Sequence, residues 1–281
     1  MKHSVGILIR SPKFMFGAIM LLLMVALVVI VPLINRADPL SMEALAFQPP
    51  GGRLLLGSDN FGRDLFLELV YGIRTSIMVG LVAGVFATII GLAIGLLCGY
   101  AGGLLDNILT AVTNMFIVIP SFIILILISV SINSRSSLLV AVIIGLTSWP
   151  WTARAVRAQT SSLRNRDHVN LAKISGHSTP KIIVFEILPY IASYVVMAFI
   201  LQVASGILSE ASISMLGLGP YNTISLGIIM NWALVFEAPV AGAWWAFIPA
   251  AFSIAVITFS LYMINTGMDE IFNPKIRSER A

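Results

Sequence analysis

The side chains that could perform chemistry are few in this chain, and their spacing matches no familiar reactive site. The three histidines, His3, His168 and His177, have no Cys or carboxylate at metal-site spacing. The one cysteine, Cys98, has no second cysteine to pair with, and its apolar surroundings are typical of a small core residue. The Gly-x-x-x-x-Gly-Lys-Ser/Thr phosphate loop and the Gly-x-Ser-x-Gly nucleophile motif are both missing. We therefore expect no catalytic, cofactor-binding or metal-binding residues, and no ATP hydrolysis by this chain alone.

The composition indicates a protein that crosses a membrane several times. The chain is 58% hydrophobic and 11% charged, whereas a soluble domain is about 25% charged. The net charge of +4 does not indicate nucleic-acid binding, because the basic residues flank apolar runs. The first run, residues 14–34, carries no charge and can span the roughly 30 Å hydrocarbon core of a lipid bilayer. It is longer than the apolar region of a signal peptide, so we expect it to remain as an anchor.

Six apolar segments predict six transmembrane helices. They cover residues 14–34 (the first span), 75–105, 107–133, 138–153, 187–209 and 247–267. Pro120 predicts a kink in the third span. Most of the lysines and arginines fall in residues 1–13, 157–186 and 268–281, which predicts that both termini and this loop are cytoplasmic. Residues 35–74 are then external, and the short apolar stretch 224–236 is expected to dip into the outer face.

The spans themselves carry almost no charge, which argues against a proton-coupled carrier. Glu210, at the end of the fifth span, is the notable acid. An acid at the membrane edge is a functional candidate by default. The alternative is a carboxylate at a helix end that is bonded to local N–H groups. Both interpretations stay open at this point.

Glycines in the second span include three pairs that are four residues apart: Gly80 and Gly84, Gly91 and Gly95, and Gly95 and Gly99. This spacing places small residues on one face of a helix, where they allow a neighbouring helix to approach closely in lipid. We expect the glycines to serve helix packing; direct contact with a substrate is the alternative.

The basic loop 157–186 has the pattern of a short helix, a break and a second helix. The apolar residues of the first helix are Val169, Leu171, Ala172 and Ile174. Gly176 can end this helix by adopting the left-handed conformation, and Pro180 suits the first turn of the next one. The loop is therefore expected to be an ordered element.

The loop also carries a family resemblance. Asn170-Leu171-Ala172, three residues, Gly176 and then Ile187-Leu188-Pro189 resembles the EAA loop of permease subunits of ABC importers. The chain departs from that pattern at Asn170 and Leu171, where the family usually has Glu and Ala. In the family, this loop forms a coupling helix that docks into a groove of a cytosolic ATPase. The resemblance thus implies that the ATPase-coupling residues are Val169, Asn170, Leu171, Ala172 and Gly176.

Two further segments carry the same resemblance. Residues 56–64, LGSDNFGRD, resemble the GTDxxGRD segment of dipeptide, oligopeptide and nickel permeases, and mark the C-type subunit of the pair. From the residues alone, either Ser58 or Asp59 is expected to cap the following helix. Residues 210–219, EASISMLGLG, resemble the family's EASLSFLGLG segment. The motif residues implied by the resemblance are Gly57, Asp59, Gly62, Arg63, Asp64, Glu210, Gly217 and Gly219.

The resemblance implies an all-α membrane protein with the six-helix type I permease fold of ABC importers, with residues 75–267 as the permease core. It implies a second homologous permease, two cytosolic ATPase subunits or domains, and an extracytoplasmic solute-binding protein as partners. ATP and Mg²⁺ would bind to the ATPases, so this chain would need no cofactor. The implied location is the cell membrane, and the implied mechanism is alternating access driven by the ATPases.

The substrates implied by the resemblance are di- and oligopeptides, with nickel, glutathione or oligosaccharides as alternatives. Two other classes of protein are less consistent with the residues. An intramembrane enzyme would need paired catalytic groups within the spans, which we do not find. An ion channel would need rings of charge or a carbonyl filter, and the glycine-rich second span has the pattern of a helix instead.

Overall fold

The computed structural model describes residues 11–131, 136–220 and 223–272 of the 281-residue chain. In these residues every regular element is a helix, and five helices are long and apolar enough to cross a membrane. A bent pair makes a sixth span when it is counted as one. The predicted all-α architecture with six spans is confirmed.

The helices that make up the spans are α2 (Pro12–Ile34), α3 (Leu65–Ala101), the bent pair α4 (Gly103–Val118) and α5 (Ser121–Ser131), α6 (Ser137–Leu163), α9 (Leu188–Met215) and α11 (Ile248–Phe272). The short ones are α7 (Asp167–Ile174), α8 (Thr179–Ile182), a π-helical turn (Ile183–Ile187), α10 (Leu226–Val235) and a 3-10 turn (Trp244–Ala246).

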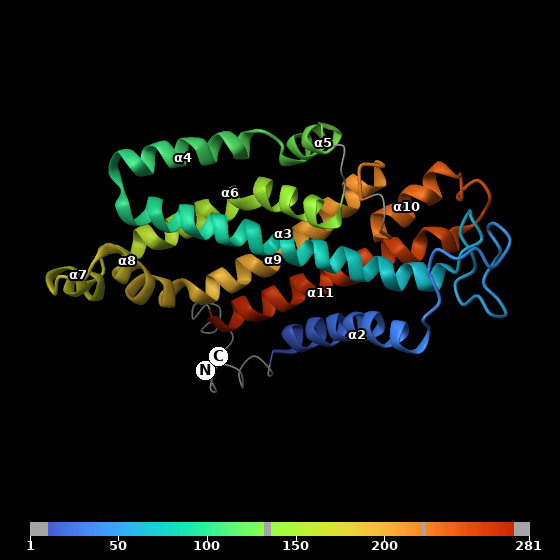
Figure 1. The fold of residues 1–281 in the computed structure, drawn as a ribbon. Coiled ribbons are helices and arrows are strands. Elements are labelled where there is room, and N and C mark those ends of the chain that lie inside the picture. Colours follow the sequence, from blue (N-terminus) through green and yellow to red (C-terminus); the bar gives the residue numbers. More distant parts are fainter. Residues whose placement is uncertain (1–10, 132–135, 221–222, 273–281) are drawn as a thin grey trace.

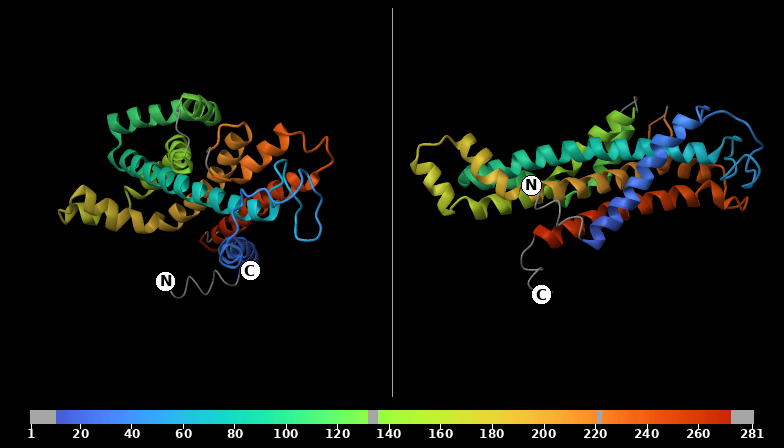
Figure 2. Two further views of the ribbon diagram at one scale, coloured as in Figure 1. Left: turned by 45° about the vertical axis from the view of Figure 1, so that its right-hand side comes forward. Right: turned by 90° about the horizontal axis from the view of Figure 1, so that it is seen from below.

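Helix α3 forms the centre of the bundle, with α6 and α9 packed against it (Figure 1). Helix α11 packs on α9, and α2 lies at the periphery against α11 (Figure 2). One end of the bundle carries α7 and α8, and the opposite end carries α10 and the 35–64 segment (Figure 1). The two ends can therefore serve different partners.

The glycines of α3 explain why this helix is central. A Cβ added to Gly80 would lie 2.4 Å from Cγ1 of Ile207 in α9. A Cβ added to Gly91 or Gly95 would lie 2.6 Å from the Cβ of Thr152 or Val156 in α6. Such distances leave no room for a side chain, so the glycines permit backbones to approach closely on two faces of α3. The predicted packing role is confirmed.

The third span is broken rather than gently kinked. Helices α4 and α5 meet at an angle of 81° next to Pro120. Proline lacks an N–H donor and disfavours the helical conformation of the residue before it, so the helix ends at Val118 and restarts at Ser121. The bend is at Pro120 as predicted, but it is a break and not the expected kink, and a cavity lies beside it.

Helices α3 and α6 extend furthest beyond their apolar segments. Helix α3 begins at Leu65, so Glu68 and Arg74 belong to its first turns, and α6 continues to Leu163. Hydropathy marks the part of a helix that lies in hydrocarbon, whereas the helix itself ends where capping groups satisfy its backbone. The cap of α3 is Asp64, whose carboxylate accepts from the N–H of Phe66 at 2.8 Å.

Candidate functional site

The loop between α6 and α9 projects from one end of the bundle and carries α7 and α8 (Figure 1). The inner face of α7 is buried through Val169 and Ala172, which are 0% and 6% exposed. These side chains join one apolar cluster with Ile182, Ile187 and Ile191. Removal of this apolar surface from water favours a fixed position, at roughly 25 cal/mol per Å². Helix α7 is thus a rigid projection rather than a loose loop.

The outer face of α7 is apolar as well as exposed. Leu171 is 64% exposed and Ile174 is 83% exposed, although both lie in a basic segment beyond the spanning helices. The two residues are three positions apart, which places them side by side on a helix surface. Together they form a small apolar knob, suited to insertion into a groove of another protein.

Gly176 ends this projection as predicted. Its φ is +77°, in the left-handed region, and its N–H donates to the carbonyl of Lys173 at 3.0 Å. The next N–H, that of His177, donates to the carbonyl of Ala172 at 3.1 Å. These bonds satisfy carbonyls that have no partner within the helix. No atom lies within 4 Å of an added Cβ, so backbone conformation rather than space requires glycine here.

Asn170 and Lys173 attach α7 to the end of α6. The Asn170 side-chain amide donates to the carbonyl of Asn165 at 3.2 Å, and Lys173 Nζ donates to the carbonyl of Arg164 at 3.0 Å. At Asn170 the family pattern usually has Glu, and an ionised carboxylate could only accept a hydrogen bond. The departure from the family pattern therefore has a local structural role in this chain.

The LGSDNFGRD segment, residues 56–64, folds into a compact, tightly turned loop at the opposite end of the bundle. We call this loop the knot, although the chain does not thread through itself. Gly57 and Gly62 have φ values of +73° and +79°. A Cβ added to Gly62 would lie 2.0 Å from the carbonyl oxygen of Ala44, which leaves no space for any other residue. The glycines allow the segment to turn tightly against residues 44–50.

Two carboxylates of the knot bind backbone N–H groups. Asp59 Oδ1 accepts from the N–H groups of Phe61 and Arg63, each at 2.8 Å, and Asp64 caps α3. The prediction that Ser58 or Asp59 caps this helix was wrong, because both side chains are used inside the knot. Desolvation by burial raises the pKa of Asp59 and of Asp64 above their ordinary values, and the backbone N–H groups oppose that rise.

Arg63 links the knot to two helices. Its guanidinium lies 4.3 Å from the ring centroid of Phe61 and 4.8 Å from that of Trp232 in α10. Its Nη1 also lies 3.4 Å from Oε1 of the buried Glu68 in α3. Cation–π and charge contacts of this kind gain strength away from water. The knot thus fixes α10 relative to α3.

Glu210 is buried at a junction of three helices. Its carboxylate accepts from Ser76 Oγ of α3 at 2.9 Å and from Ser214 Oγ of α9 at 2.6 Å. Ser76 Oγ in turn accepts from the N–H of Leu226, at the start of α10, at 3.2 Å. One partner comes from the neighbouring helix α3 and the other from the next turn of α9 itself, and Glu210 lies within α9 rather than at its end. The carboxylate therefore holds α3, α9 and α10 together.

The two glycines of the second motif belong to the same junction. Gly217 has a φ of +76° and follows the end of α9. A Cβ added to Gly219 would lie 2.2 Å from Oγ of Ser214, the serine that donates to Glu210. The structure thus brings Glu210, Gly217 and Gly219 together, while the knot and the α7 projection lie at opposite ends of the molecule (Figure 1).

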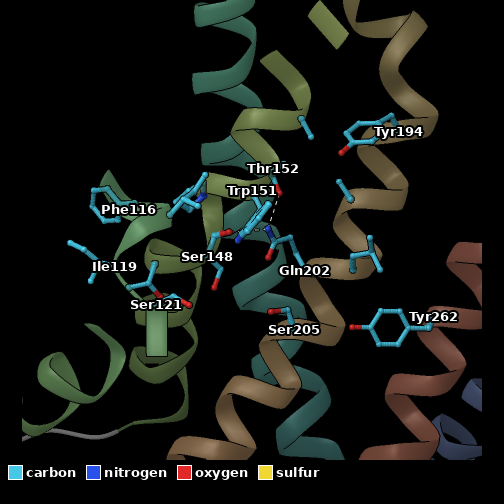
Figure 3. Close-up of a pocket in the computed structure, with 16 residues that line it drawn as sticks. Phe116, Ile119, Ser121, Ser148, Trp151, Thr152, Tyr194, Gln202, Ser205 and Tyr262 are labelled. Atoms are coloured by element: carbon cyan, nitrogen blue, oxygen red, sulfur yellow. Dashed lines mark hydrogen bonds between the residues drawn. The ribbon is translucent and has the colours of Figure 1, made fainter. Parts of the chain in front are cut away.

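A cavity of about 500 Å³ lies between the break of α4 and α5 on one side and α6, α9 and α11 on the other. Figure 3 shows Gln202 and Ser205 of α9 facing Ser148 of α6, with Tyr262 of α11 on the other side. The sequence analysis did not predict Gln202 and Ser205, because isolated polar residues in an apolar helix match no motif. Their spacing of three positions, which places them on one helix face, is the signal that could have found them.

Comparison with known families identifies the chain. Residues 91–278 match the family described as the inner membrane component of binding-protein-dependent transport systems. The match covers α6, the α7 projection, α9 with Glu210, and α10. The chain belongs to this family.

Similar members of the family match along almost the whole chain. A putative peptide transport system permease protein of Brucella abortus is 32% identical over 97% of this chain and 91% of its own length. The oligopeptide transport system permease protein OppC of Mycobacterium tuberculosis is 31% identical over 94% and 90%. The dipeptide transport system permease protein DppC of Bacillus subtilis is 29% identical over 95% and 83%.

Membership of the inner-membrane-component family confirms the resemblance predicted from the motifs. A member of this family is a membrane-spanning transport component, which agrees with the apolar helices of the structure. Members are permease subunits, not enzymes in themselves, since ATP hydrolysis belongs to a separate subunit. The chain is therefore a membrane-spanning component of a transport system.

Proposed function

We propose that this chain is one of two permease subunits of an ATP-driven ABC importer, and that its substrates are di- and oligopeptides. The observation that carries the proposal is the α7 projection, a rigid helix with an exposed apolar knob at one end of a membrane-spanning bundle. The substrate class is supported by the names of relatives that match over nearly the full chain.

The proposed partners follow from that role. They are a second homologous permease, two cytosolic ATPase subunits or domains that bind ATP and Mg²⁺, and an extracytoplasmic solute-binding protein. The C-type assignment rests on the LGSDNFGRD segment together with relatives named OppC and DppC. The lipid bilayer of the cell membrane surrounds the assembly.

We place α7 and both termini in the cytoplasm. The start of α2 packs against the last turns of α11, where a Cβ added to Gly267 would lie 2.6 Å from the N of Phe14, and both are on the side of the bundle that faces α7 (Figure 1). That side also holds the basic loop, and cytoplasmic loops carry an excess of Lys and Arg. The knot of residues 56–64 and α10 then face the outside, where the solute-binding protein would dock.

In the proposed mechanism, α7 transmits the motion of the ATPases to the spanning helices. Leu171 and Ile174 insert into a groove of the ATPase, while Val169 and Ala172 fix α7 to the bundle. Gly176 ends the helix, so the groove moves a knob of defined length. Because the knob is rigid, movement of the groove tilts α6 and α9. This tilt opens the translocation path alternately to the cytoplasmic and the outer side of the membrane.

The two outer motifs are proposed to keep the external ends of the helices in register during this tilt. The residues are Gly57, Asp59, Gly62, Arg63 and Asp64 in the knot, and Glu210, Gly217 and Gly219 at the junction. Their contacts bind α10 to α3 and α9 through buried charge and hydroxyl groups.

Uptake of labelled di- and tripeptides by cells with and without this chain tests the function. Loss of peptide uptake on deletion, and its restoration by the intact gene, is the expected result. Unchanged peptide uptake, with loss of nickel or oligosaccharide uptake instead, would overturn the proposed substrate and leave the transport role.

A further inference from the structure

The cavity beside α9 opens where the bundle has no helix of its own to cover it. Along α9, Leu201, Ser205 and Leu208 form an exposed stripe, and the first two of these line the cavity. Trp151 of α6, 65% exposed, and Tyr262 of α11 border the same opening (Figure 3). A space that is open on one side within the spanning part of a two-permease transporter is suited to completion by the second permease.

The lining of the cavity combines apolar side chains with polar ones that carry no charge. The apolar part includes Phe116, Ile119 and Leu201, and the polar part consists of serine, threonine and tyrosine hydroxyls and the amide of Gln202. Among the described lining residues there is no Asp, Glu, Lys, Arg or His. Polar side chains at membrane depth are unfavourable unless they have partners or face water, so this set marks a hydrated space. At about 500 Å³, the space is within the range of small-molecule sites.

Gln202 has the most defined orientation in this lining. Its Nε2 donates to the carbonyl of Ser148 at 2.9 Å and to Oγ1 of Thr152 at 2.8 Å (Figure 3). Both hydrogens of the amide nitrogen are used, which leaves the carbonyl oxygen of the side chain as its acceptor. The bonds also fix α9 to α6. Gln202 thus offers a fixed acceptor among the hydroxyls of the lining.

We propose that this cavity is the chain's share of the translocation path, and that it receives the amide groups of a peptide backbone. The inference rests on the proposed function. Gln202 accepts from a peptide N–H, and the hydroxyls of Ser205 and its neighbours donate to peptide carbonyls. All peptides share these groups, whereas a fixed charge in the path would retain some side chains and repel others. Weak, exchangeable hydrogen bonds allow entry and release alike.

The proposal predicts that a new charge at Ser205 creates selectivity by side-chain charge. Ser205→Asp should lower uptake of acidic tripeptides relative to basic ones by about tenfold, and Ser205→Lys should do the reverse, because unlike charges attract and like charges repel across the cavity. The measurement is uptake of Ala-Glu-Ala and Ala-Lys-Ala by cells that carry the whole transporter. Ser131→Asp and Ser131→Lys, at the exposed end of α5 outside the cavity lining, are the matched controls and should leave the ratio unchanged.

A second measurement covers the case in which charged variants fail to assemble. Ser205→Cys in a Cys98→Ala background should react with a charged methanethiosulfonate reagent, and an excess of trialanine should slow the reaction during ATP hydrolysis. Val29→Cys, on the exposed face of α2, is the control. It should react slowly with the reagent, and its reaction rate should be the same with and without trialanine.

The results separate the inference from the proposed function. If deletion of the chain abolishes peptide uptake, yet the Ser205 variants show no charge selectivity and trialanine gives no protection, the cavity is not the path. If deletion leaves peptide uptake intact, the proposed function itself fails. Opposite selectivities in the two Ser205 variants, or protection by trialanine, would support the inference.

Discussion

At the scale of the residue, Gly176 is the position where a single backbone angle controls the α7 projection. Its φ of +77° is unfavourable for L-residues, at roughly 1–2 kcal/mol, and most unfavourable for β-branched ones. Gly176→Val should therefore unwind the end of α7 and uncouple ATP hydrolysis from peptide uptake. The measurement is the ratio of peptide transported to ATP hydrolysed by the reconstituted complex. Gly176→Asn is the control, since Asn tolerates the left-handed conformation; equal ratios in both variants would contradict this role.

Gly62 is required for a different reason, because space as well as conformation is limiting. An alanine Cβ would lie 2.0 Å from the carbonyl oxygen of Ala44, in addition to a φ of +79°. Gly62→Ala should destabilise the knot by more than the roughly 1–2 kcal/mol of the backbone conformation alone. Gly52→Ala supplies the control, with a φ of +59° and no atom within 4 Å of the added Cβ. Thermal unfolding in detergent should show the larger fall in Tm for Gly62→Ala; similar shifts would refute the steric explanation.

At the scale of the element, Glu210 determines how α10 is held. Glu210→Leu removes the acceptor for Ser76 and Ser214 and leaves buried hydroxyls without their partner, at about 1–3 kcal/mol for each unsatisfied group. We expect a lower Tm and faster proteolysis of the segment around α10 in proteoliposomes. Glu210→Gln retains one carbonyl acceptor and should have a smaller effect. If Leu and Gln have equal effects, the carboxylate does not act through these hydrogen bonds.

The elements also explain how far the sequence could lead. Uncharged runs predicted the spans, Gly176 predicted a helix end, Pro120 predicted a bend although not a full break, and the spacing of Gly91 and Gly95 predicted close packing, because each depends on local backbone chemistry. The sequence could not place Gln202 beside Ser148, since that contact depends on how α6 and α9 cross. The cap of α3 was misplaced because Ser58 and Asp59 are equally good capping residues in isolation.

At the scale of the whole molecule, the decisive prediction concerns orientation. Ile174 on α7 and Val240 between α10 and α11 are each 83% exposed, and they lie at opposite ends of the bundle. In a Cys98→Ala background, a membrane-impermeant maleimide should label Val240→Cys in intact cells, and Ile174→Cys only after the cells are opened. The two sites act as controls for each other, because their equal exposure removes accessibility as an explanation. Co-expression of the ATPase partner should then protect Ile174→Cys and not Val240→Cys, since only α7 is proposed to enter its groove. Labelling of Ile174→Cys from outside would place the projection on the wrong side of the membrane for a cytosolic ATPase and would remove the basis of the coupling mechanism.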